Sequence, residues 1–361
     1  MKAGGSLWES TQKAKKKTSD LGEIKEHTID SKKIEKPPME KDLERTYSEI
    51  GKTYKGLLSE MGKTVLGQEE VMENILIAVF TKSHALLEGF PGLGKTLIVK
   101  TLSDIMDLKF KRVQCTPDLM PSDITGTYVV EEKEGKKSFR FERGPVFTNI
   151  LLADEINRAT PKTQSALLEA MQERQVSVGT STYPLDPPFF VLATQNPIEM
   201  EGTYPLPEAQ VDRFLLKILV DYPGEEHEEK IMDLYSGEKT PESRRVISKN
   251  ELLNIQELIR KMPIAAVIRK YALNIVRNTR PMDNGIASEF LDYGASPRAS
   301  IGLVVASKAR ALIKGRDYVS KEDIEAMAYP ILRHRIILNF ESERKGVKPD
   351  DVIEKIIKES W

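Results

Sequence analysis

The sequence lacks the features that define several classes of protein. Its 361 residues include one cysteine, Cys115, and four histidines that are far apart. A single cysteine excludes a disulfide framework, and scattered histidines exclude most zinc sites built from protein ligands. No apolar run reaches transmembrane length, and the amino terminus has no apolar core of the signal-peptide type. We therefore expect a cytoplasmic protein that makes no membrane contact.

An excess of charge of one sign is also missing. Charged residues make up 30% of the chain, but they nearly cancel to a net charge of −1. A protein that coats nucleic acid or an anionic membrane usually carries excess positive charge. The hydrophobic content of 40% is sufficient for buried cores, and the length is sufficient for two domains and an appendage. The composition thus favours a mostly globular protein.

Composition changes along the chain and divides it into regions. Residues 1–39 are lysine-rich and poor in apolar residues, so this tail is predicted to be disordered. Residues 40–223 are predicted to form an α/β domain that opens with an amphipathic helix over residues 43–65. Five apolar runs then alternate with helix-like segments, which is typical of a parallel sheet flanked by helices. The runs are HALLEG, KFKRVQC, NILLADE, FFVLATQN and RFLLKILV.

The remainder of the chain, residues 224–361, shows helix signals and no further strand-like run. Ser248 and Glu251 have the spacing of a capping box. Ser296, followed by a proline, and Gly315 bracket another helical segment. These signals predict an all-helical second domain.

The segment GFPGLGKT, residues 89–96, has P-loop spacing and lies between a predicted strand and a predicted helix. Its glycines would let backbone N–H groups form an anion-binding nest at the helix amino terminus. Lys95 would then contact the β- and γ-phosphates of ATP, and the Thr96 hydroxyl would bind Mg²⁺. The alternative is a glycine-rich turn with an incidental lysine. The predicted nucleotide-binding residues of this segment are Gly89, Pro91, Gly92, Leu93, Gly94, Lys95, Thr96 and Leu97.

Polar residues also end two other predicted strands. Asp154 and Glu155 follow NILLA, and because side chains alternate along a strand they should point in different directions. Asp154 is predicted to act at the Mg²⁺ ion by holding a metal-bound water, and Glu155 is predicted to address the attacking water. Ligands of open parallel sheets gather at the carboxyl ends of the strands, so Asn196 should join them and contact the water or the γ-phosphate. The alternatives are a solvated strand end for the acids and a turn for Asn196.

Two arginines have settings that call for an anion. Arg213 directly precedes an apolar run, and a guanidinium stays charged and is rarely buried alone. Arg298 lies near a helix start, where a cation opposes the helix dipole, and the γ-phosphate of ATP is the natural candidate for its partner. Two alternatives remain open. Arg213 would pair with Glu208 or Asp212 in its own loop, and Arg298 would be a solvated surface residue.

As an ordered set, GFPGLGKT, LLADEINRA, ATQNP, LPEAQVDRF and GASPRA resemble the motifs of the MoxR family of AAA+ ATPases, over roughly residues 65–335. The resemblance implies a P-loop sheet domain of the ASCE type followed by a helical lid, a hexameric ring, and ATP bound between neighbouring subunits. VLGQEE, which contains Val65 and Gly67, resembles the segment that packs on adenine. The implied roles are Walker A for Lys95 and Thr96, Walker B for Asp154 and Glu155, sensor 1 for Asn196, arginine finger toward the adjacent chain for Arg213, and sensor 2 for Arg298.

Two functions are compatible with these motifs. In the first, a chaperone-like ATPase remodels a protein client, in the family often together with a von Willebrand factor A domain protein. In the second, the chain is a nucleic-acid translocase, like the replicative helicases related to the family. A non-enzymatic scaffold would require defective catalytic residues, whereas Glu155 and Arg213 are both present.

Two predicted hairpins, over residues 129–147 and 175–189, help to choose between these functions, since hairpins in such rings can line a pore. The tip of the second hairpin, SVGTSTYP, has no lysine or arginine. In the first hairpin the cations are diluted by Glu131, Glu132 and Glu134. A pore that grips phosphates needs cations, so we favour the chaperone-like ATPase and expect no nucleic-acid partner.

Replacing Lys95 tests the P-loop assignment. We expect Lys95→Ala to abolish ATP binding, because the ammonium group that contacts the phosphates is lost. Calorimetric titration with Mg-ATP measures the effect, and Lys100→Ala, five residues further along the predicted helix, is the matched control. An unchanged ATP affinity in Lys95→Ala would defeat the assignment.

Overall fold

A computed structural model describes residues 41–133, 136–197, 202–237, 241–282 and 285–361 of the chain. The predicted tail, residues 1–39, lies outside the described residues. In the part of the chain that is described, no helix combines the length and the apolar character needed to cross a bilayer.

Five parallel strands form the central sheet in the order β2-β5-β8-β1-β9. Each coincides with one of the five apolar runs, so the predicted α/β fold is confirmed. Strand β8 lies between β1, which precedes the P-loop, and β5, which carries the acidic pair. The strands are β1 (Ala85–Gly89), β2 (Phe110–Gln114), β5 (Ile150–Asp154), β8 (Phe190–Gln195) and β9 (Leu216–Val220).

Strand β2 differs from the sequence prediction in its burial. The run KFKRVQC is grouped with strands buried on both faces, and for β2 this is wrong because Lys111, Arg112 and Gln114 are exposed. β2 is an edge strand of the sheet, and an edge strand has a neighbouring strand on one side only. The exposed side chains of β2 are therefore free to contact the end of β5.

Helices cover the sheet, and the first of them reaches the second domain. α2 (Lys41–Met61) agrees with the predicted amphipathic helix, although Gly51 and Gly56 are poor helix formers. A Cβ atom at Gly51 would lie 2.9 Å from the Cα atom of Gly315, so glycine is needed for this close approach. The other main helices of the sheet domain are α3 (Glu69–Phe80), α4 (Lys95–Ile105) and α6 (Pro161–Glu173).

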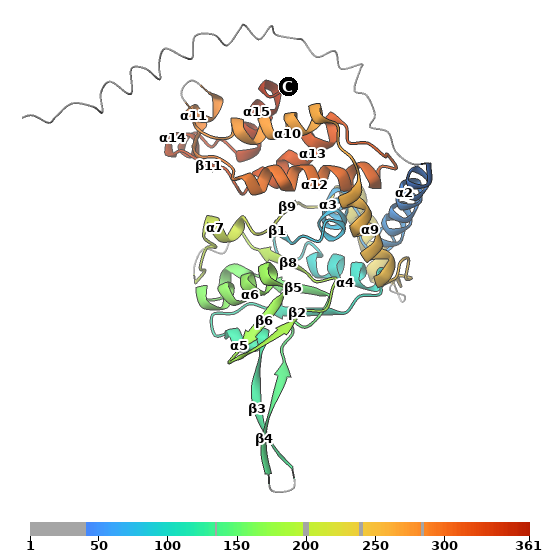
Figure 1. The fold of residues 1–361 in the computed structure, drawn as a ribbon, viewed down its shortest axis with the longest axis vertical. Helices are drawn as coiled ribbons and strands as arrows, with labels where there is room; N and C mark the ends of the chain where they lie inside the picture. Colours follow the sequence, from blue (N-terminus) through green and yellow to red (C-terminus); the bar gives the residue numbers. More distant parts are fainter. Residues whose placement is uncertain (1–40, 134–135, 198–201, 238–240, 283–284) are drawn as a thin grey trace, which may run out of the picture. The chain divides into compact units, whose positions relative to one another are not determined.

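Both predicted hairpins are present. β3 (Gly126–Lys133) pairs with β4 (Lys136–Arg143) and extends away from the sheet, as Figure 1 shows. β6 (Gln175–Val178) pairs with β7 (Ser181–Pro184). The rings of Phe141 and Tyr183 stack with centroids 4.2 Å apart, and the hydroxyl groups of Tyr128 and Tyr183 are 2.8 Å apart. The base of the long hairpin is therefore attached to the short one.

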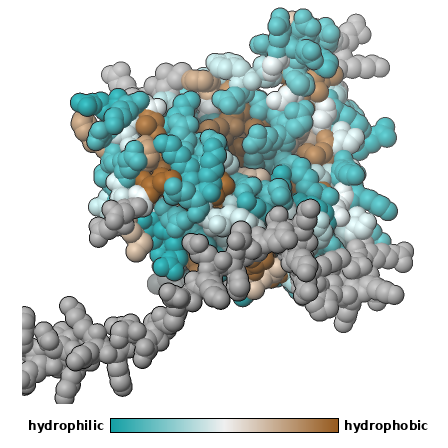
Figure 2. Space-filling model, turned by 90° about the horizontal axis from the view of Figure 1, so that it is seen from above, coloured by the Kyte–Doolittle hydropathy of each residue, from teal (hydrophilic) through white to brown (hydrophobic). Residues whose placement is uncertain are grey.

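The second domain is helical, as predicted, and Ser248 and Glu251 form the expected capping box. The sequence analysis missed one feature of it: β10 (Leu291–Tyr293) and β11 (Ile337–Leu338) pair in antiparallel fashion. Strands of two or three residues are too short to produce a recognisable pattern. Figure 2 looks onto the side of the molecule where these helices lie, and hydrophilic residues cover most of that face. The helices are α8 (Glu225–Ser236), α9 (Lys249–Lys261), α10 (Ala266–Asn278), α11 (Ile286–Phe290), α12 (Pro297–Ile313), α13 (Lys321–Leu332), α14 (Phe340–Arg344) and α15 (Pro349–Glu359).

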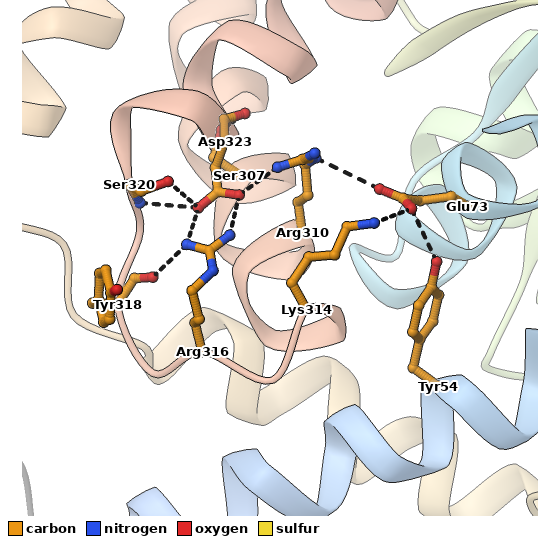
Figure 3. Close-up of polar contacts among 9 residues, drawn as sticks. All are labelled: Tyr54, Glu73, Ser307, Arg310, Lys314, Arg316, Tyr318, Ser320 and Asp323. Atoms are coloured by element: carbon orange, nitrogen blue, oxygen red, sulfur yellow. Dashed lines mark hydrogen bonds and ion pairs between the residues drawn. The ribbon is translucent and has the colours of Figure 1, made fainter.

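An ionic network joins the two domains, as Figure 3 shows. Glu73 of α3 accepts hydrogen bonds from Tyr54 of α2, at 3.2 Å, and from Lys314, at 2.6 Å. Arg310 of α12 lies 3.5 Å from Glu73 and donates to Asp323 of α13 at 2.7 Å. The side chain of Asp323 is fully buried, so its negative charge depends on Arg310 and on Arg316, which donates to it at 2.6 and 2.7 Å. The network therefore fixes α12 and α13 against α2 and α3.

Candidate functional site

The P-loop has the backbone that its sequence predicts. Gly92 and Gly94 have φ angles of +84° and +74°, a region that residues with a side chain rarely adopt. A Cβ atom at either position would meet nothing within 4 Å, so the loop faces open space. Helix α4 begins at Lys95, directly after Gly94. The loop and the helix amino terminus together form a concave set of N–H groups suited to a phosphate.

The Lys95 side chain lies back on the loop that precedes it. Its Nζ atom donates to the carbonyl oxygens of Gly89, at 2.5 Å, and Phe90, at 3.1 Å. Partial burial lowers the pKa of Lys95, while the negative charges of Asp154 and Glu155 act in the opposite direction. The ammonium group thus belongs to the same electrostatic site as the two acids.

Asp154 ends β5 and is held on both carboxylate oxygens. Thr194 of β8 donates to Oδ1 at 2.6 Å, and Arg112 of β2 donates to Oδ2 at 2.6 and 3.0 Å. The same Thr194 hydroxyl accepts the N–H group of Glu155 at 2.8 Å. Strands β2, β5 and β8 are thereby tied together at the point where the acidic pair begins.

Glu155 has a φ angle of +55°, in the left-handed region that is uncommon for a residue with a side chain. Such backbone outliers gather at functional sites. Its Oε2 atom accepts hydrogen bonds from Gln114, at 2.8 Å, and from Arg158 of the 3₁₀ helix η1 (Ile156–Arg158), at 3.0 Å. The carboxylates of Glu155 and Asp154 therefore face different partners.

Asn196 follows β8 directly and is 7% exposed. Ala153 and Ala193 are paired in the sheet, which places Asn196 beside the acidic pair. The structure thus gathers four predicted site residues, Lys95, Asp154, Glu155 and Asn196, at the carboxyl ends of β1, β5 and β8.

A cavity of about 400 Å³ adjoins the P-loop and has a largely apolar lining. Val65, Leu97 and the loop residues 91–94 line one side of it. Ile231 and Tyr235 of α8 line another, and the Tyr235 hydroxyl donates to the Thr64 carbonyl oxygen at 2.7 Å. Its size and apolar lining suit a nucleotide base. Gly67, predicted as a nucleotide contact, does not line it.

Gly67 instead serves the packing of α8. Its φ angle is +71°, and a Cβ atom at this position would lie 2.9 Å from the ring of His227. Glycine therefore allows α8, which carries part of the cavity wall, to approach the segment before α3.

Arg213 lies where the parallel strands begin, whereas the acidic pair lies where they end. These two ends of the strands are called the amino-terminal and carboxyl-terminal edges of the sheet. The N–H group of Leu215 donates to the His84 carbonyl oxygen at 2.8 Å, and Leu216 pairs with Ala85 at the start of β1. β1 has five residues, which rise about 3.3 Å each, so roughly 15 Å separate this edge from the P-loop. The structure therefore does not bring Arg213 to the P-loop of its own chain.

Arg213 has little to bind within its own chain. It donates to the Leu168 carbonyl oxygen at 2.9 Å, and across the described ranges it forms no ion pair with Glu208 or Asp212. A guanidinium with a single carbonyl partner retains free donors for an anion.

Arg298 lies beside Arg213 rather than at the P-loop. Its Nη1 atom is 3.5 Å from the Asp212 carboxylate, and its side chain is half exposed. Asp212 thus supplies the anion that a cation near the start of α12 requires. The two predicted arginines therefore lie at one edge of the sheet and the predicted phosphate-binding residues at the other.

Sequence reasoning missed several residues that surround the acidic pair and the cavity. Thr194, Arg112 and Gln114 contact Asp154 or Glu155. Thr194 belongs to the ATQNP motif without a role assigned to it, and no motif distinguishes Arg112 and Gln114 from ordinary strand residues. Ile231 and Tyr235 belong to a helix whose placement depends on tertiary packing. The position of Thr194 at the end of a strand was the one signal available beforehand.

Cys115, the chain's one cysteine, directly follows Gln114 and is buried. Burial, together with Asp154 and Glu155, raises the pKa of its thiol to about 12. The thiol is therefore protonated at neutral pH and poorly suited to nucleophilic attack, which requires the thiolate form.

Two family models match the chain. The model described as "ATPase family associated with various cellular activities (AAA)" matches residues 84–216. The model described as "AAA lid domain" matches residues 284–356. Together they cover strands β1, β2, β5 and β8 with the acidic pair, and about half of the second domain.

Relatives of similar length share much of the sequence. Chaperone MoxR1 of Mycobacterium tuberculosis is 43% identical over 308 residues, which are 84% of this chain and 81% of the relative. Protein MoxR of Methylorubrum extorquens is 32% identical over 316 residues, 81% of this chain and 90% of the relative. A Cytophaga hutchinsonii crystal structure, described as a candidate ATPase, has a TM-score of 0.81 and 47% identity, and covers 88% of this chain and 96% of its own.

Replacing Ile231 tests the cavity. We expect Ile231→Glu to raise the KM for ATP at least about tenfold and to leave kcat within about twofold, because a carboxylate in the apolar cavity wall opposes base binding but lies away from the acidic pair. Met232→Glu is the matched control, since Met232 is the next residue of α8 and is 62% exposed. Steady-state ATPase kinetics measure both variants. Equal KM values in the two variants would show that the cavity does not bind the nucleotide base.

Proposed function

The chain belongs to the MoxR family of AAA+ ATPases, and we propose that it hydrolyses ATP between the subunits of a ring in order to remodel or mature a protein client. One observation carries the interfacial part of this proposal. Arg213 and the P-loop lie at opposite edges of one sheet, so Arg213 cannot complete the site of its own chain. In a closed ring each subunit presents one edge to its neighbour's other edge, and each site then receives the arginine that it lacks.

The residues of the P-loop edge suit Mg-ATP. The N–H groups of the open loop would cradle the phosphates, and Lys95 would turn from its carbonyl partners toward them. Thr96 and Asp154 would hold Mg²⁺, which supplies charge neutralisation when it is bound. Mg²⁺ is usually held by one or two protein side chains together with substrate phosphates.

Glu155 is the proposed general base for the attacking water, and Asn196 the residue that orients this water. In the structure the Oε2 atom of Glu155 is engaged by Gln114 and Arg158. Arg112 similarly occupies Asp154. Each carboxylate oxygen can accept more than one hydrogen bond, so these contacts orient the two carboxylates and leave acceptor capacity for water and metal.

Arg213 and Arg298 are proposed to act together on the neighbouring site. Both lie at the amino-terminal edge of the sheet, with Asp212 between them. An arginine finger typically contributes 10³- to 10⁵-fold to the rate of phosphoryl transfer. A solitary subunit would therefore be nearly inactive, and a hexamer is the assembly that we propose.

The long hairpin supports a protein client rather than a nucleic acid. Val130 and Phe139, a cross-strand pair, are 59% and 77% exposed. Arg140 of the same hairpin lies 3.9 Å from Glu131, which offsets its charge. Exposed apolar side chains suit protein contact, whereas binding to a phosphate backbone needs uncompensated cations. A von Willebrand factor A domain protein is the proposed assisting partner.

Mixed rings test the interfacial site. We expect Arg213→Ala to bind ATP normally and to lose at least about 10³-fold in kcat. Lys95→Ala subunits bind no ATP but still carry Arg213, so mixing the two variants should restore turnover at the mixed interfaces. ATPase assays on the mixture and on each variant alone measure this. Stable mixed rings without any recovery would contradict the role of Arg213 in the neighbouring site.

A stalled variant tests the client. We expect Glu155→Gln to bind ATP without hydrolysing it, and to retain a protein client when it is isolated from cell extract in the presence of ATP. Glu155→Gln combined with Lys95→Ala, which cannot bind ATP, is the control. The captured protein should raise the ATPase rate of the unmodified chain, and single-stranded DNA should not. Stimulation by DNA without stimulation by the protein would favour the translocase.

A further inference from the structure

Arg335, which follows α13, contacts the segment that carries Arg213 on both sides of that residue. Its guanidinium donates to the Asp212 carboxylate at 2.7 Å. It also donates to the carbonyl oxygens of Phe214, at 2.6 Å, and Leu215, at 3.0 Å. We propose that Arg335 is a positioning residue through which the lid of one subunit sets the placement of Arg213, and thereby the hydrolysis rate at the neighbouring subunit's site. This inference rests on the interfacial site proposed above.

The contact is buried and charged, so lid and segment cannot separate freely. The Arg335 side chain is 2% exposed, and burial lowers the pKa of its guanidinium while Asp212 raises it. Removing one partner of a buried pair leaves an uncompensated charge in the interior, which is strongly unfavourable. A displacement of the lid must therefore move the 212–215 segment with it or break this pair.

The side chain of Asp212 is engaged by the second domain. Within the described ranges, its carboxylate contacts Arg335, Arg298 at 3.5 Å and Ser296 at 3.4 Å. These three partners come from two separate stretches of the lid. The position of Asp212, the residue next to the proposed arginine finger, therefore depends on the position of the lid.

The rest of the segment is packed equally closely. Phe214 is fully buried in the core, and His334 makes a further contact of 3.0 Å to its carbonyl oxygen. A Cβ atom at Gly302 would lie 2.7 Å from the Leu215 side chain, so α12 also rests on this segment. The backbone that bears Arg213 is therefore enclosed between the core of the sheet domain and the lid.

The lid is also connected to the nucleotide cavity of its own chain. Gln68 lines that cavity and directly precedes α3. Glu73 of α3 contacts Arg310 of α12 and Lys314, the residue that directly follows α12. Occupation of one site can therefore bias the lid, and the lid in turn biases Arg213. Coupling of this kind is a free energy between two sites and is measurable as such.

Mixed rings test the inference when only one kind of subunit interface can hydrolyse ATP. Donor subunits carry Lys95→Ala, so they supply Arg213 but bind no ATP. Acceptor subunits carry Arg213→Ala, so they bind ATP but supply no finger. Arg335→Gln is then added either to the donor or to the acceptor, and kcat and KM for ATP are measured at matched subunit ratios.

We expect Arg335→Gln in the donor to lower kcat about 10- to 100-fold at unchanged KM, since small misplacement of a catalytic group costs about that much. The same change in the acceptor should alter kcat less than about threefold. Equal losses in donor and acceptor would overturn the inference and leave the interfacial site standing. Absence of turnover in the mixture without any change at Arg335 would instead contradict the proposed function, and the inference with it.

Further variants separate positioning from folding. Asp212→Asn keeps the size of the side chain and removes the ion pair, and in the donor it should reproduce the loss seen with Arg335→Gln. Arg335→Lys, which keeps the charge but not the planar fork, should recover part of the activity. Arg333→Gln is the matched control, because Arg333 pairs with Asp350 in the lid and touches the sheet domain at the Lys217 carbonyl oxygen, outside the 212–215 segment, and it should change kcat less than about threefold. Native mass spectrometry verifies that all mixtures form rings of equal size, and a donor loss matched by Arg333→Gln would overturn the inference.

Discussion

Parallel strand pairing is the constraint on which the rest of this structure depends. Because β1, β5 and β8 run in one direction, the polar residues that end them are delivered to the same edge, however far apart they are in the chain. The same geometry places Arg213, three residues before β9, at the amino-terminal ends of the strands. The proposed phosphate site and Arg213 are thus separated by the length of a strand within one chain, and in the proposed ring a neighbouring copy of the chain brings them together.

Sequence reasoning was most effective where chemistry and local structure coincide. The glycines of the P-loop are identified by spacing, and their positive φ angles explain why that spacing matters. The five strands are identified by apolar runs, but β2 shows the limit of that signal, because its exposure follows from its place at the sheet edge. Arg112 and Gln114 contact the acidic pair only because β2 lies next to β5. That neighbourhood is set by strand order, which the sequence does not display.

For the arginines, the sequence predicts that a partner is needed but not which residue provides it. Their need for an anion follows from the chemistry of guanidinium, and the sequence reveals it. The partner of Arg298 is Asp212, which the sequence offers equally well as a partner for Arg213. Arg335 has no sequence signal, since a lone arginine after a helix has no motif, and its four hydrogen bonds to the 212–215 segment arise from the docking of the lid. Burial, rather than pattern, distinguishes it from the many surface arginines.

The stacked rings of Phe141 and Tyr183 have a mechanical consequence. Load applied to the outer part of the β3–β4 hairpin would pass along the chain from β4 into β5 and, through this stack, also into β6–β7 and on into β8. An aromatic pair contributes about 1 kcal/mol beyond its buried area, much less than the hydrogen-bonded ladder of either hairpin. The stack would therefore yield before either hairpin ladder does, and the two hairpins would then separate while each keeps its own strand pairing.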